Sequence, residues 1–322
     1  MSATAVFSCG EVLVTGAGGL IGSAVLRAFA TNGRPVRAHM GPPGATVREA
    51  PPGITTTFAD IDDVHAMTRL CSGASCVVHL AGPPSVAKSF DAPADFVRAH
   101  AAGTAAVLEA CRATRVPRMI YISSAEVYGR PLRNPVAEDH PRQPRSPYAA
   151  SKVCAEDLIS TCCASFGISA AILRPFSVIG PNVPPASVLG SIVRQALRGP
   201  EIGVYAPQVI RDYLFVDDVA KAVLCCFERA PLSGAVEIYN IGSGVGTSVA
   251  ALGGAVQNQL GKTPNVGLAP GLDRPQAADI EVLVADITKA TTELGWRPQT
   301  SLDAALSSII DAFQMESTTC GS

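Results

Sequence analysis

The feature that most constrains this chain is a glycine-rich turn close to its start. An apolar run, 11–15, leads directly into Gly16, and two further glycines follow at three-residue spacing, Gly19 and Gly22. A second apolar stretch, 23–30, comes next and has the composition of a helix. Glycines at these positions let bare backbone approach a pyrophosphate, whose charge the start of the helix stabilises. The pattern therefore predicts a strand, a tight turn and a helix that together hold a dinucleotide.

Short apolar runs recur through the first half of the chain and are separated by helix-like stretches. The runs that we expect to be strands are 11–15, 35–39, 54–58, 76–80, 119–123 and 169–174. Strands that alternate with helices form a parallel sheet that is covered on both faces. The predicted class is therefore α/β, with a doubly wound sheet of the Rossmann type.

The pattern changes after Pro175, where prolines interrupt shorter elements and the alternation becomes irregular. We therefore expect a dinucleotide-binding domain at 1–175, which also carries the catalytic residues. A smaller substrate-binding region should occupy 176–316, with some of its segments returning to the sheet. Residues 317–322 are small and polar, and we expect them to be frayed.

Composition argues against several classes of protein. The chain has 322 residues, 48% of them hydrophobic and 16% charged, and its formal net charge is −2. This balance argues against disorder and against a basic surface for nucleic acid or anionic membranes. The longest uncharged stretch, 238–261, is interrupted by glycines, and no basic residue precedes an apolar run at 1–10. We therefore expect neither a membrane span nor a secretory signal, and we expect a cytoplasmic protein.

Ten cysteines raise the question of a metal site or of disulfides. None of them forms a Cys-x-x-Cys pair, and the adjacent cysteines at 162–163 and 225–226 lie in helix-like segments where neighbouring side chains diverge. We expect reduced cysteines that pack as small hydrophobic side chains, and no metal.

The later strands indicate how the cofactor would be held. The second strand is followed by Met40, where an acidic residue usually binds the adenosine ribose of NAD. Without that carboxylate the choice between NAD and NADP stays open, and Arg37 or Arg48 could meet a 2′-phosphate. The other residues that we expect at the cofactor follow the glycine turn and the third and fourth strands: Leu20, Ile21, Asp60, Ile61, Leu80, Ala81 and Gly82.

A tyrosine and a lysine four residues apart form the candidate catalytic pair. Tyr148 and Lys152 share one face of a predicted helix. A free tyrosine has a pKa of about 10. A neighbouring ammonium and a cationic nicotinamide favour its phenolate and so lower that pKa. Tyr148 could then act as a base or an acid near neutral pH, and both residues would also contact the cofactor. Ser124, at the end of the strand 119–123, could hydrogen-bond the same substrate oxygen.

Taken in order, these motifs resemble those of the extended short-chain dehydrogenase/reductases that remodel nucleotide sugars, the NAD-dependent epimerase/dehydratase family. The resemblance runs from Val12 to about Leu306. Its further motifs are Gly103-Thr104, Arg174-Pro175, Gly180-Pro181, the segment 211–218, Asn240-Ile-Gly-Ser-Gly244, the segment 286–290 and Leu294-Gly-Trp296. Several independent motifs in the expected order make the resemblance specific.

The resemblance implies a transient oxidation of a nucleotide-diphosphate sugar. Tyr148 would take the proton from a sugar hydroxyl while the C4 hydride passes to the nicotinamide, which later returns it. The resemblance also implies that Pro175 contacts the cofactor and that Arg211 and Arg274 hold the diphosphate. Ser177 stands where the family usually has an Asn that touches the diphosphate.

Family members commonly dimerise through two long helices, here 101–111 and 148–160, so the resemblance implies a homodimer. Small side chains would allow the helices of two subunits to approach closely, namely those of Ala101, Ala102, Ala105 and Ala106.

Two further positions depart from the family's patterns. Family 4,6-dehydratases carry Thr-Asp-Glu where this chain has Ser124-Ala125-Glu126, and Ala125 cannot protonate a leaving hydroxyl. Glu126 could still act as an acid or base, as a Glu at this place does in decarboxylases and mannose dehydratases of the family, or it could hydrogen-bond a substrate hydroxyl. His100 stands where the family usually has Asn, and we expect it to be a buried supporting residue.

The main hypothesis is therefore a nucleotide-sugar 4-epimerase with a tightly bound nicotinamide cofactor, NAD with NADP as the alternative. Its substrate contacts would be Ser124, Ala125, Glu126, Tyr148, Ser177, Arg211 and Arg274. The alternatives are a dehydratase or decarboxylase that uses Glu126, a single-step ketoreductase, and a non-catalytic dinucleotide-binding protein. The intact Ser124, Tyr148 and Lys152 argue against the last of these.

Overall fold

The computed structural model of this chain describes residues 10–45, 47–181, 183–229, 235–269 and 280–319. The chain divides into two compact units that interleave along the sequence. The first unit contains Met1–Ser124, Ser146–Leu173 and Ala220–Tyr239, and the second contains Ala125–Arg145, Arg174–Val219 and Asn240–Ser322. The sequence analysis placed the main boundary at 175, with some later segments returning to the sheet. In the structure the later segment Ala220–Tyr239 belongs to the first unit, and the earlier segment Ala125–Arg145 belongs to the second.

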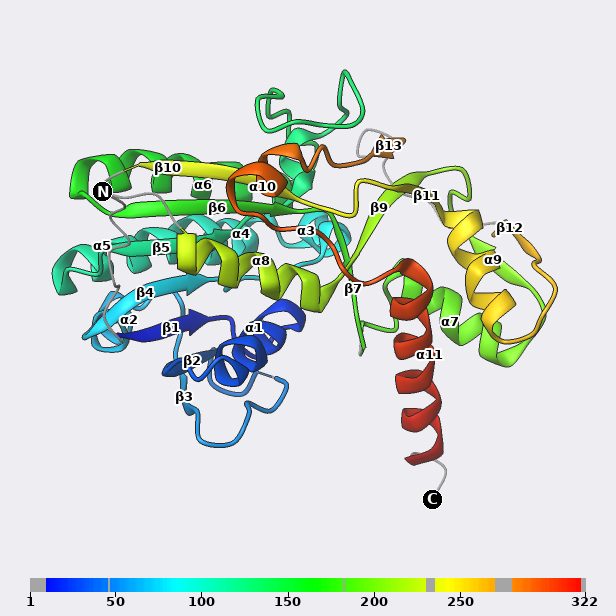
Figure 1. The fold of residues 1–322 in the computed structure, drawn as a ribbon, viewed down its shortest axis with the longest axis horizontal. Helices are drawn as coiled ribbons and strands as arrows, with labels where there is room; N and C mark the ends of the chain where they lie inside the picture. Colours follow the sequence, from blue (N-terminus) through cyan, green and yellow to red (C-terminus); the bar gives the residue numbers. More distant parts are fainter. Residues whose placement is uncertain (1–9, 46, 182, 230–234, 270–279, 320–322) are drawn as a thin grey trace. The chain divides into compact units, whose positions relative to one another are not determined.

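The central feature of the first unit is a seven-stranded sheet with the strand order β10-β6-β5-β4-β1-β2-β3 (Figure 1). The neighbouring pairs from β3 to β6 are parallel. The strand order reverses between β1 and β4, and ligands of such sheets bind at this switch point. The predicted class, α/β with a doubly wound sheet of the Rossmann type, is confirmed. The strands are β1 (Glu11–Thr15), β2 (Val36–Gly41), β3 (Thr55–Phe58), β4 (Ala74–His79), β5 (Arg118–Ile122), β6 (Ser169–Pro175) and β10 (Val236–Ile241).

Helices cover both faces of this sheet (Figure 1). On one face, Phe29 of α1 (Leu20–Thr31) and Phe227 of α8 (Val216–Arg229) form an edge-to-face ring pair with centroids 5.3 Å apart. On the other face, α2 (Val64–Cys71), α5 (Gly103–Thr114) and α6 (Pro147–Phe166) share a buried apolar core. Its members include Leu13, Met67, Val77, Val107, Met119, Ile159 and Ile172.

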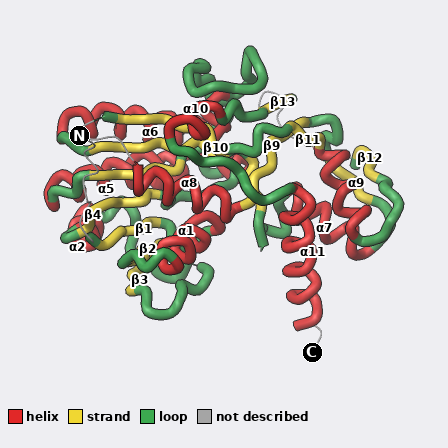
Figure 2. Tube along the Cα trace, viewed as in Figure 1, coloured by secondary structure: helices red, strands yellow, loops and turns green. Residues whose placement is uncertain are grey.

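The second unit has shorter strands (Figure 2). In its four-stranded sheet, β9 (Ile210–Phe215) pairs with β7 (Ser177–Ile179), β11 (Gly246–Ser248) and β13 (Val282–Leu283). A separate parallel pair joins β8 (Ile202–Val204) to β12 (Val266–Leu268). The helices are α7 (Val188–Arg198), α9 (Val249–Gln259), α10 (Thr288–Glu293) and α11 (Leu302–Thr319). The last helix continues to Thr319, three residues into the segment that we expected to be frayed.

The described cysteines pack largely as the composition suggested. All of those in the described part of the chain are free thiols, and Cys71, Cys76, Cys111, Cys163 and Cys226 are buried. Within the described ranges, no group of three or more His, Cys, Asp or Glu side chains could hold a metal ion. No helix in the described ranges is long and apolar enough to cross a membrane.

Candidate active site

The glycine turn between β1 and α1 has the geometry that a dinucleotide requires. Gly16 has a φ of +68°, and a Cβ there would lie 2.7 Å from the backbone of Ala81. A Cβ on Gly22 would lie 2.3 Å from the Gly16 carbonyl oxygen. Gly19 begins α1 without a side-chain cap, and a Cβ there would find that same oxygen nearest, at 3.3 Å. Because only backbone stands at the start of this helix, its amides suit the negative charge of a pyrophosphate, and the residues fit an NAD-type cofactor.

Strand β2 does not provide the arginine that we suggested for a 2′-phosphate. Arg37 donates from Nη1 to the Leu70 carbonyl oxygen at 3.1 Å and from Nη2 to that of Ser72 at 3.0 Å. It also pairs with Glu11 at 2.5 Å. Contrary to that suggestion, the Arg37 guanidinium is committed to joining β1 and β2 to the end of α2.

Arg48 lies closer to the glycine turn. Its amide donates to the Gly18 carbonyl oxygen at 3.1 Å, and burial together with the charge of Arg27 lowers the pKa of its guanidinium. Met40, which replaces the usual acidic residue, is buried. The Arg48 main chain thus lies beside the glycine turn, and its role at a 2′-phosphate stays a prediction.

The end of β3 carries two predicted cofactor residues. Asp60 is exposed and lies two residues after the end of the strand. The Ile61 side chain packs against Gly103 at the start of α5, where a Cβ would lie 2.7 Å from it. Gly103 of the Gly103-Thr104 motif therefore leaves room for Ile61, which places the segment 60–61 beside α5.

The end of β4 lies against the glycine turn. The Leu80 amide donates to the Thr15 carbonyl oxygen at 3.1 Å, and this bond aligns the residues that follow the two strands. Ala81 is the residue whose backbone approaches Gly16. Gly82 has a φ of +136°, and a Cβ there would lie 2.2 Å from the ring of His100. The segment 80–82 is thus held between the turn and that histidine.

A buried hydrogen-bonded chain joins these strand ends to α5. His79 Nδ1 lies 2.7 Å from Thr15 Oγ1, and its Nε2 lies 3.0 Å from Thr104 Oγ1. Burial lowers the pKa of His79 to about 3, so the ring is neutral and has one donor and one acceptor nitrogen. These hydrogen bonds fix the end of β1, at Thr15, relative to α5, at Thr104.

Helix α6 carries both members of the candidate catalytic pair. The helix begins at a defined place because Ser146 Oγ accepts from the Ala149 amide at 3.1 Å and a proline follows in the first turn. Tyr148 and Lys152 lie about one turn apart, and both are buried. Lys152 Nζ donates to the Ile122 carbonyl oxygen at 2.8 Å, at the end of β5.

The surroundings of Lys152 set its charge. Its Nζ lies 4.9 Å from the centroid of the Tyr121 ring. Burial lowers the pKa of Lys152 to about 7, and the charge of Glu156 opposes this shift. Glu156 is itself buried and accepts from Ser123 Oγ at 2.5 Å. The lysine therefore sits between protonation states near neutral pH, where a nearby charge change can move it.

The Tyr148 ring is held by two other rings. His100 and Phe96 lie edge-to-face to it, with centroids 5.5 Å and 6.2 Å away. His100 lies in a π-helical turn, Arg98–Ala102, and its Nδ1 is 2.8 Å from Ser151 Oγ, which donates to the Tyr148 carbonyl oxygen at 2.7 Å. Burial lowers the pKa of His100 to about 2, so its ring is neutral. The expectation of a buried supporting histidine agrees with these contacts.

The segment after β5 separates the three residues of the Ser-Ala-Glu triplet. Ser124 is half-buried and follows the strand in the first unit, which also contains Tyr148 and Lys152. Ala125 and Glu126 begin a short 3-10 helix, Ala125–Tyr128, in the second unit. Ala125 is buried and Glu126 is half-buried. The chain thus crosses between its units within the triplet.

In the second unit, two predicted substrate residues share one face of the β7–β9 sheet. Ser177 begins β7 opposite Tyr213 of β9, and Arg211 lies two residues earlier on the same strand. Arg211 Nη1 donates to the Ile280 carbonyl oxygen at 2.8 Å. Sequence analysis missed Tyr213, although the period-two alternation of a strand would have placed it beside Arg211. Burial raises the pKa of Tyr213 to about 12.

The remaining predicted site residues are also distributed over the two units. Pro175 is buried at the end of β6, in the second unit. Leu20 and Ile21 are half-buried in the first turn of α1. Arg274 lies outside the described residues.

Other family-motif residues of the second unit hold its loops together. Asp212 accepts from the amide and hydroxyl of Ser243, both at 2.6 Å, and from the amides of Gly244 at 2.9 Å and Ala285 at 3.1 Å. Asn240 donates to the Val136 carbonyl oxygen at 2.8 Å and accepts from Tyr128 Oη at 2.6 Å. Their contacts give these motif positions a structural role.

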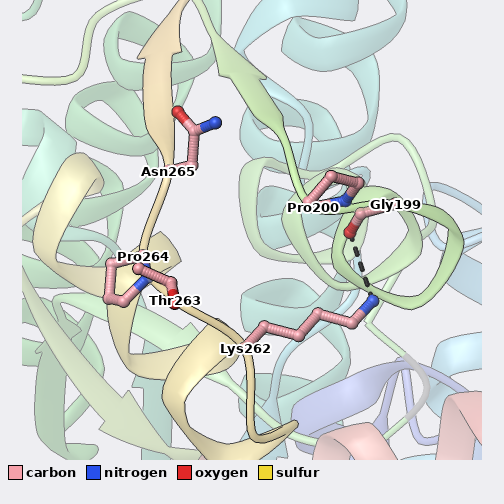
Figure 3. Close-up of a pocket in the computed structure, with 6 residues that line it drawn as sticks. All are labelled: Gly199, Pro200, Lys262, Thr263, Pro264 and Asn265. Carbon is pink, nitrogen blue, oxygen red and sulfur yellow. Dashed lines mark hydrogen bonds between the residues drawn. The ribbon is translucent and has the colours of Figure 1, made fainter.

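A surface cavity of about 580 Å³ lies in the second unit (Figure 3). Its lysine, Lys262, donates to the carbonyl oxygens of Ala196 and, at 3.2 Å, Gly199, at the C-terminal end of α7. A cation in that position stabilises the helix end. None of the predicted site residues lines this cavity, so it does not serve as the candidate active site.

The doubly wound sheet and the glycine turn, with Tyr148 and Lys152 one helical turn apart on α6, are typical of a dinucleotide-dependent enzyme of the short-chain dehydrogenase type. Comparison with known families makes the assignment more specific. The chain belongs to the NAD dependent epimerase/dehydratase family, whose sequence model matches residues 12–242. The resemblance inferred from the motifs is therefore confirmed.

Individual relatives cover almost the whole chain. The UDP-glucose 4-epimerase of Streptomyces lividans is 31% identical over 325 residues, which cover 96% of each chain. That of Azospirillum brasilense is 31% identical and covers 90% of this chain and 87% of the relative. Among solved structures, the UDP-glucose 4-epimerase of Thermus thermophilus in complex with NAD has a TM-score of 0.83 at 30% identity, covering 94% of this chain and 99% of that one.

Proposed function

We propose that this protein is a nucleotide-sugar 4-epimerase that acts on UDP-hexoses by transient oxidation at C4, with NAD as its cofactor. The observation that carries the proposal is the buried Tyr148 and Lys152 pair on α6, at the end of the strand that leads to Ser124. The near full-length similarity to UDP-glucose 4-epimerases supports the substrate class. The NAD-bound structure of a relative supports the cofactor.

The roles of the catalytic residues follow from their chemistry. When bound, the nicotinamide supplies the hydride acceptor and donor for C4 of the sugar. Tyr148, as the phenolate, takes the proton from the C4 hydroxyl and returns it in the reverse step. The Lys152 ammonium, about one turn away, stabilises the phenolate by its charge. The Ser124 hydroxyl donates to the same sugar oxygen and orients it.

The diphosphate would be bound in the second unit. Arg211 supplies a cation, and Ser177 and Tyr213 supply hydroxyl groups on the same face of the sheet. Arg274 is proposed as the second cation at the diphosphate. Ser177 is shorter than the Asn usual at its place, so we assign it a supporting contact rather than the main one.

Position 125 favours epimerisation over dehydration. Removal of a sugar hydroxyl as water requires an acid beside the leaving group, and Ala125 has no proton to give. Glu126 retains a carboxylate, and a dehydratase or decarboxylase that uses it is the second candidate function. In the proposed epimerase, Glu126 holds a substrate hydroxyl and takes no proton.

The experiment that tests the proposal is incubation of the purified protein with UDP-glucose in heavy water, with no added cofactor. Formation of UDP-galactose without deuterium uptake, followed by proton NMR and mass spectrometry, is the expected result. Loss of water from UDP-glucose, or of carbon dioxide from UDP-glucuronate in a parallel incubation, with deuterium in the product would establish the second candidate function instead. No turnover of any UDP-hexose, with NAD bound, would overturn both.

Glu126→Gln separates the two candidates at the level of one residue. The substitution keeps the shape and removes the proton-transfer ability of the side chain. An epimerase should keep its turnover number within about fivefold, since only a hydrogen bond is altered. A loss of more than about a hundredfold, the size expected for a lost acid or base, would show that Glu126 takes part in the chemistry.

The proposal also includes a homodimer formed through the exposed sides of α5 and α6. Ala102 and Ala105 are exposed and small, as the interface requires. Ala101 and Ala106 are buried within the chain, so of the four alanines only Ala102 and Ala105 could contact a second subunit directly. Light scattering should give the dimer mass at micromolar concentration, and a monomer would exclude this interface.

A cytoplasmic location is part of the same proposal, and subcellular fractionation tests it.

A further inference from the structure

His39, near the end of β2, links the glycine turn to the end of β3. Its side chain is completely buried; its Nδ1 accepts from the Gly16 amide at 3.4 Å, and its Nε2 lies 2.9 Å from the Ala59 carbonyl oxygen. The His39 carbonyl oxygen accepts from the Ala17 amide at 3.0 Å. One residue therefore receives two consecutive amides of the turn, one on its side chain and one on its main chain.

The two ring contacts determine which nitrogen carries the proton. A backbone amide can only donate, and a carbonyl oxygen can only accept, so Nδ1 is unprotonated and Nε2 carries the proton. Burial lowers the pKa of His39, against the smaller effects of the Ala59 hydrogen bond and the charge of Asp60. The neutral ring is therefore the form that satisfies both partners at physiological pH.

The position of Gly16 determines where α1 begins. Its carbonyl oxygen accepts from the Gly19 amide at 3.1 Å, and Gly22 lies against the same oxygen. A displacement of Gly16 would therefore displace the first turn of α1. That turn holds the amide groups that suit a pyrophosphate.

We propose that His39 is a positioning residue for the cofactor, whose ring fixes the Gly16 amide and thereby the start of α1. The inference rests on the cofactor binding of the proposed function. His39 acts through the turn and does not need to touch the dinucleotide. An apolar side chain would fill the same space but would leave the Gly16 amide without this acceptor, and an unsatisfied buried amide favours a shifted turn.

Three substitutions separate the two ring contacts. His39→Leu removes both of them. His39→Asn keeps an oxygen at the place of Nδ1 and so keeps the acceptor for Gly16, whereas His39→Gln places an amide group near Nε2 and keeps the contact to Ala59. The readouts are the dissociation constant for NAD, from calorimetric titration without sugar, and the melting temperature of the apo protein. We expect the affinity for NAD to fall about tenfold in His39→Leu and less than about threefold in His39→Asn, with His39→Gln resembling the leucine variant.

His140 provides a matched control in the second unit. It is also buried, its Nε2 accepts from the Leu132 amide at 2.9 Å, and its Nδ1 lies 2.8 Å from the Pro141 carbonyl oxygen. His140→Leu should lower the melting temperature as His39→Leu does. It should leave the dissociation constant for NAD unchanged.

Each outcome bears on a defined claim. Unchanged NAD affinity in His39→Leu, with a lower melting temperature, would show that His39 only fills the core and would overturn the inference. If His39→Leu does not fold, the other two variants decide, and an affinity in His39→Gln equal to or tighter than in His39→Asn would overturn it. NAD binding without any sugar turnover would overturn the proposed function alone, and a wild-type protein that binds no dinucleotide would overturn both.

Discussion

Replacement of Lys152 by methionine should make the protein without cofactor more stable, and its stability less dependent on pH. The side chain is 4% exposed, and burial lowers the pKa of its ammonium from 10.5 to about 7. Below pH 7 the folded protein must hold a buried cation. As the pH rises from about 7 toward about 10.5, the folded state has lost this proton while the unfolded chain still binds it, so unfolding becomes less favourable.

The expected gain in stability of Lys152→Met follows from the difference between the pKa of Lys152 in the folded protein and in the unfolded chain. The difference between the two pKa values destabilises the folded wild-type protein by about 4 kcal/mol at about pH 7 and by about 1 kcal/mol at about pH 9.5. Methionine fills a similar volume but loses the 2.8 Å hydrogen bond to the Ile122 carbonyl oxygen, which offsets roughly 1 kcal/mol of the gain. The variant should therefore be more stable by about 3 kcal/mol at about pH 7 and no more stable than the wild type at about pH 9.5.

Urea unfolding of both proteins at the two pH values, followed by circular dichroism in the presence of a reductant, measures this difference. Burial raises the pKa of the Cys76 and Cys226 thiols, and their ionisation in the unfolded chain also makes stability depend on pH. Both proteins contain these thiols, so the contribution cancels when the wild-type value is subtracted. A variant that is less stable at about pH 7, or a difference that does not change with pH, would refute the argument that Lys152 is a buried cation near its titration point.

Three further predictions test other parts of the site. Tyr148→Phe should abolish epimerisation and leave the dissociation constant for NAD within about twofold, by calorimetric titration, because the ring contacts with His100 persist. Gly82→Ala should lower the unfolding free energy by about 2 kcal/mol or more, because φ is +136° and the new Cβ would lie 2.2 Å from the His100 ring. In the His100→Ala background, where the ring is absent, the same Gly82→Ala substitution should cost less in thermal unfolding; an equal cost in both backgrounds would show that backbone strain alone causes the loss. Asp212→Asn should cost about 2 kcal/mol in urea unfolding, because both carboxylate oxygens accept from donors and the NH2 that replaces one of them cannot accept; an unchanged midpoint would contradict this.

The parts of the fold that were predictable from sequence are those with local causes. The glycine turn could be recognised because the positive φ of Gly16 and the close approach at Gly22 are requirements of the strand–turn–helix itself. The spacing of Tyr148 and Lys152 placed them about one turn apart on α6 for the same reason. A strand order that reverses between β1 and β4 then follows from the connection rules of parallel sheets.

The errors concern contacts that join distant parts of the chain. Arg37 has the composition of a phosphate ligand, yet its partners are the carbonyl groups of Leu70 and Ser72 at the end of α2. Nothing near it in sequence indicates that these carbonyl groups lie within reach. Nor does the sequence near His39 indicate its two ring partners, which are Gly16 after β1 and Ala59 after β3. Such residues can be assigned only when the packing of the strands is known.

The segment 211–218 shows why a motif identifies a family more reliably than it identifies site residues. Within β9, Asp212 and Leu214 are buried, and Asp212 satisfies the loop that begins at Ser243. Arg211 and Tyr213 alternate with them and are half-buried on the other face of the strand, where Tyr213 is the register partner of Ser177. One short motif therefore carries both a structural set and a candidate ligand-binding set, and the strand's period of two separates them. The resemblance supplied the motif, but only the strand register shows that Arg211 and Tyr213 share the face of Ser177, the face that we propose for the substrate.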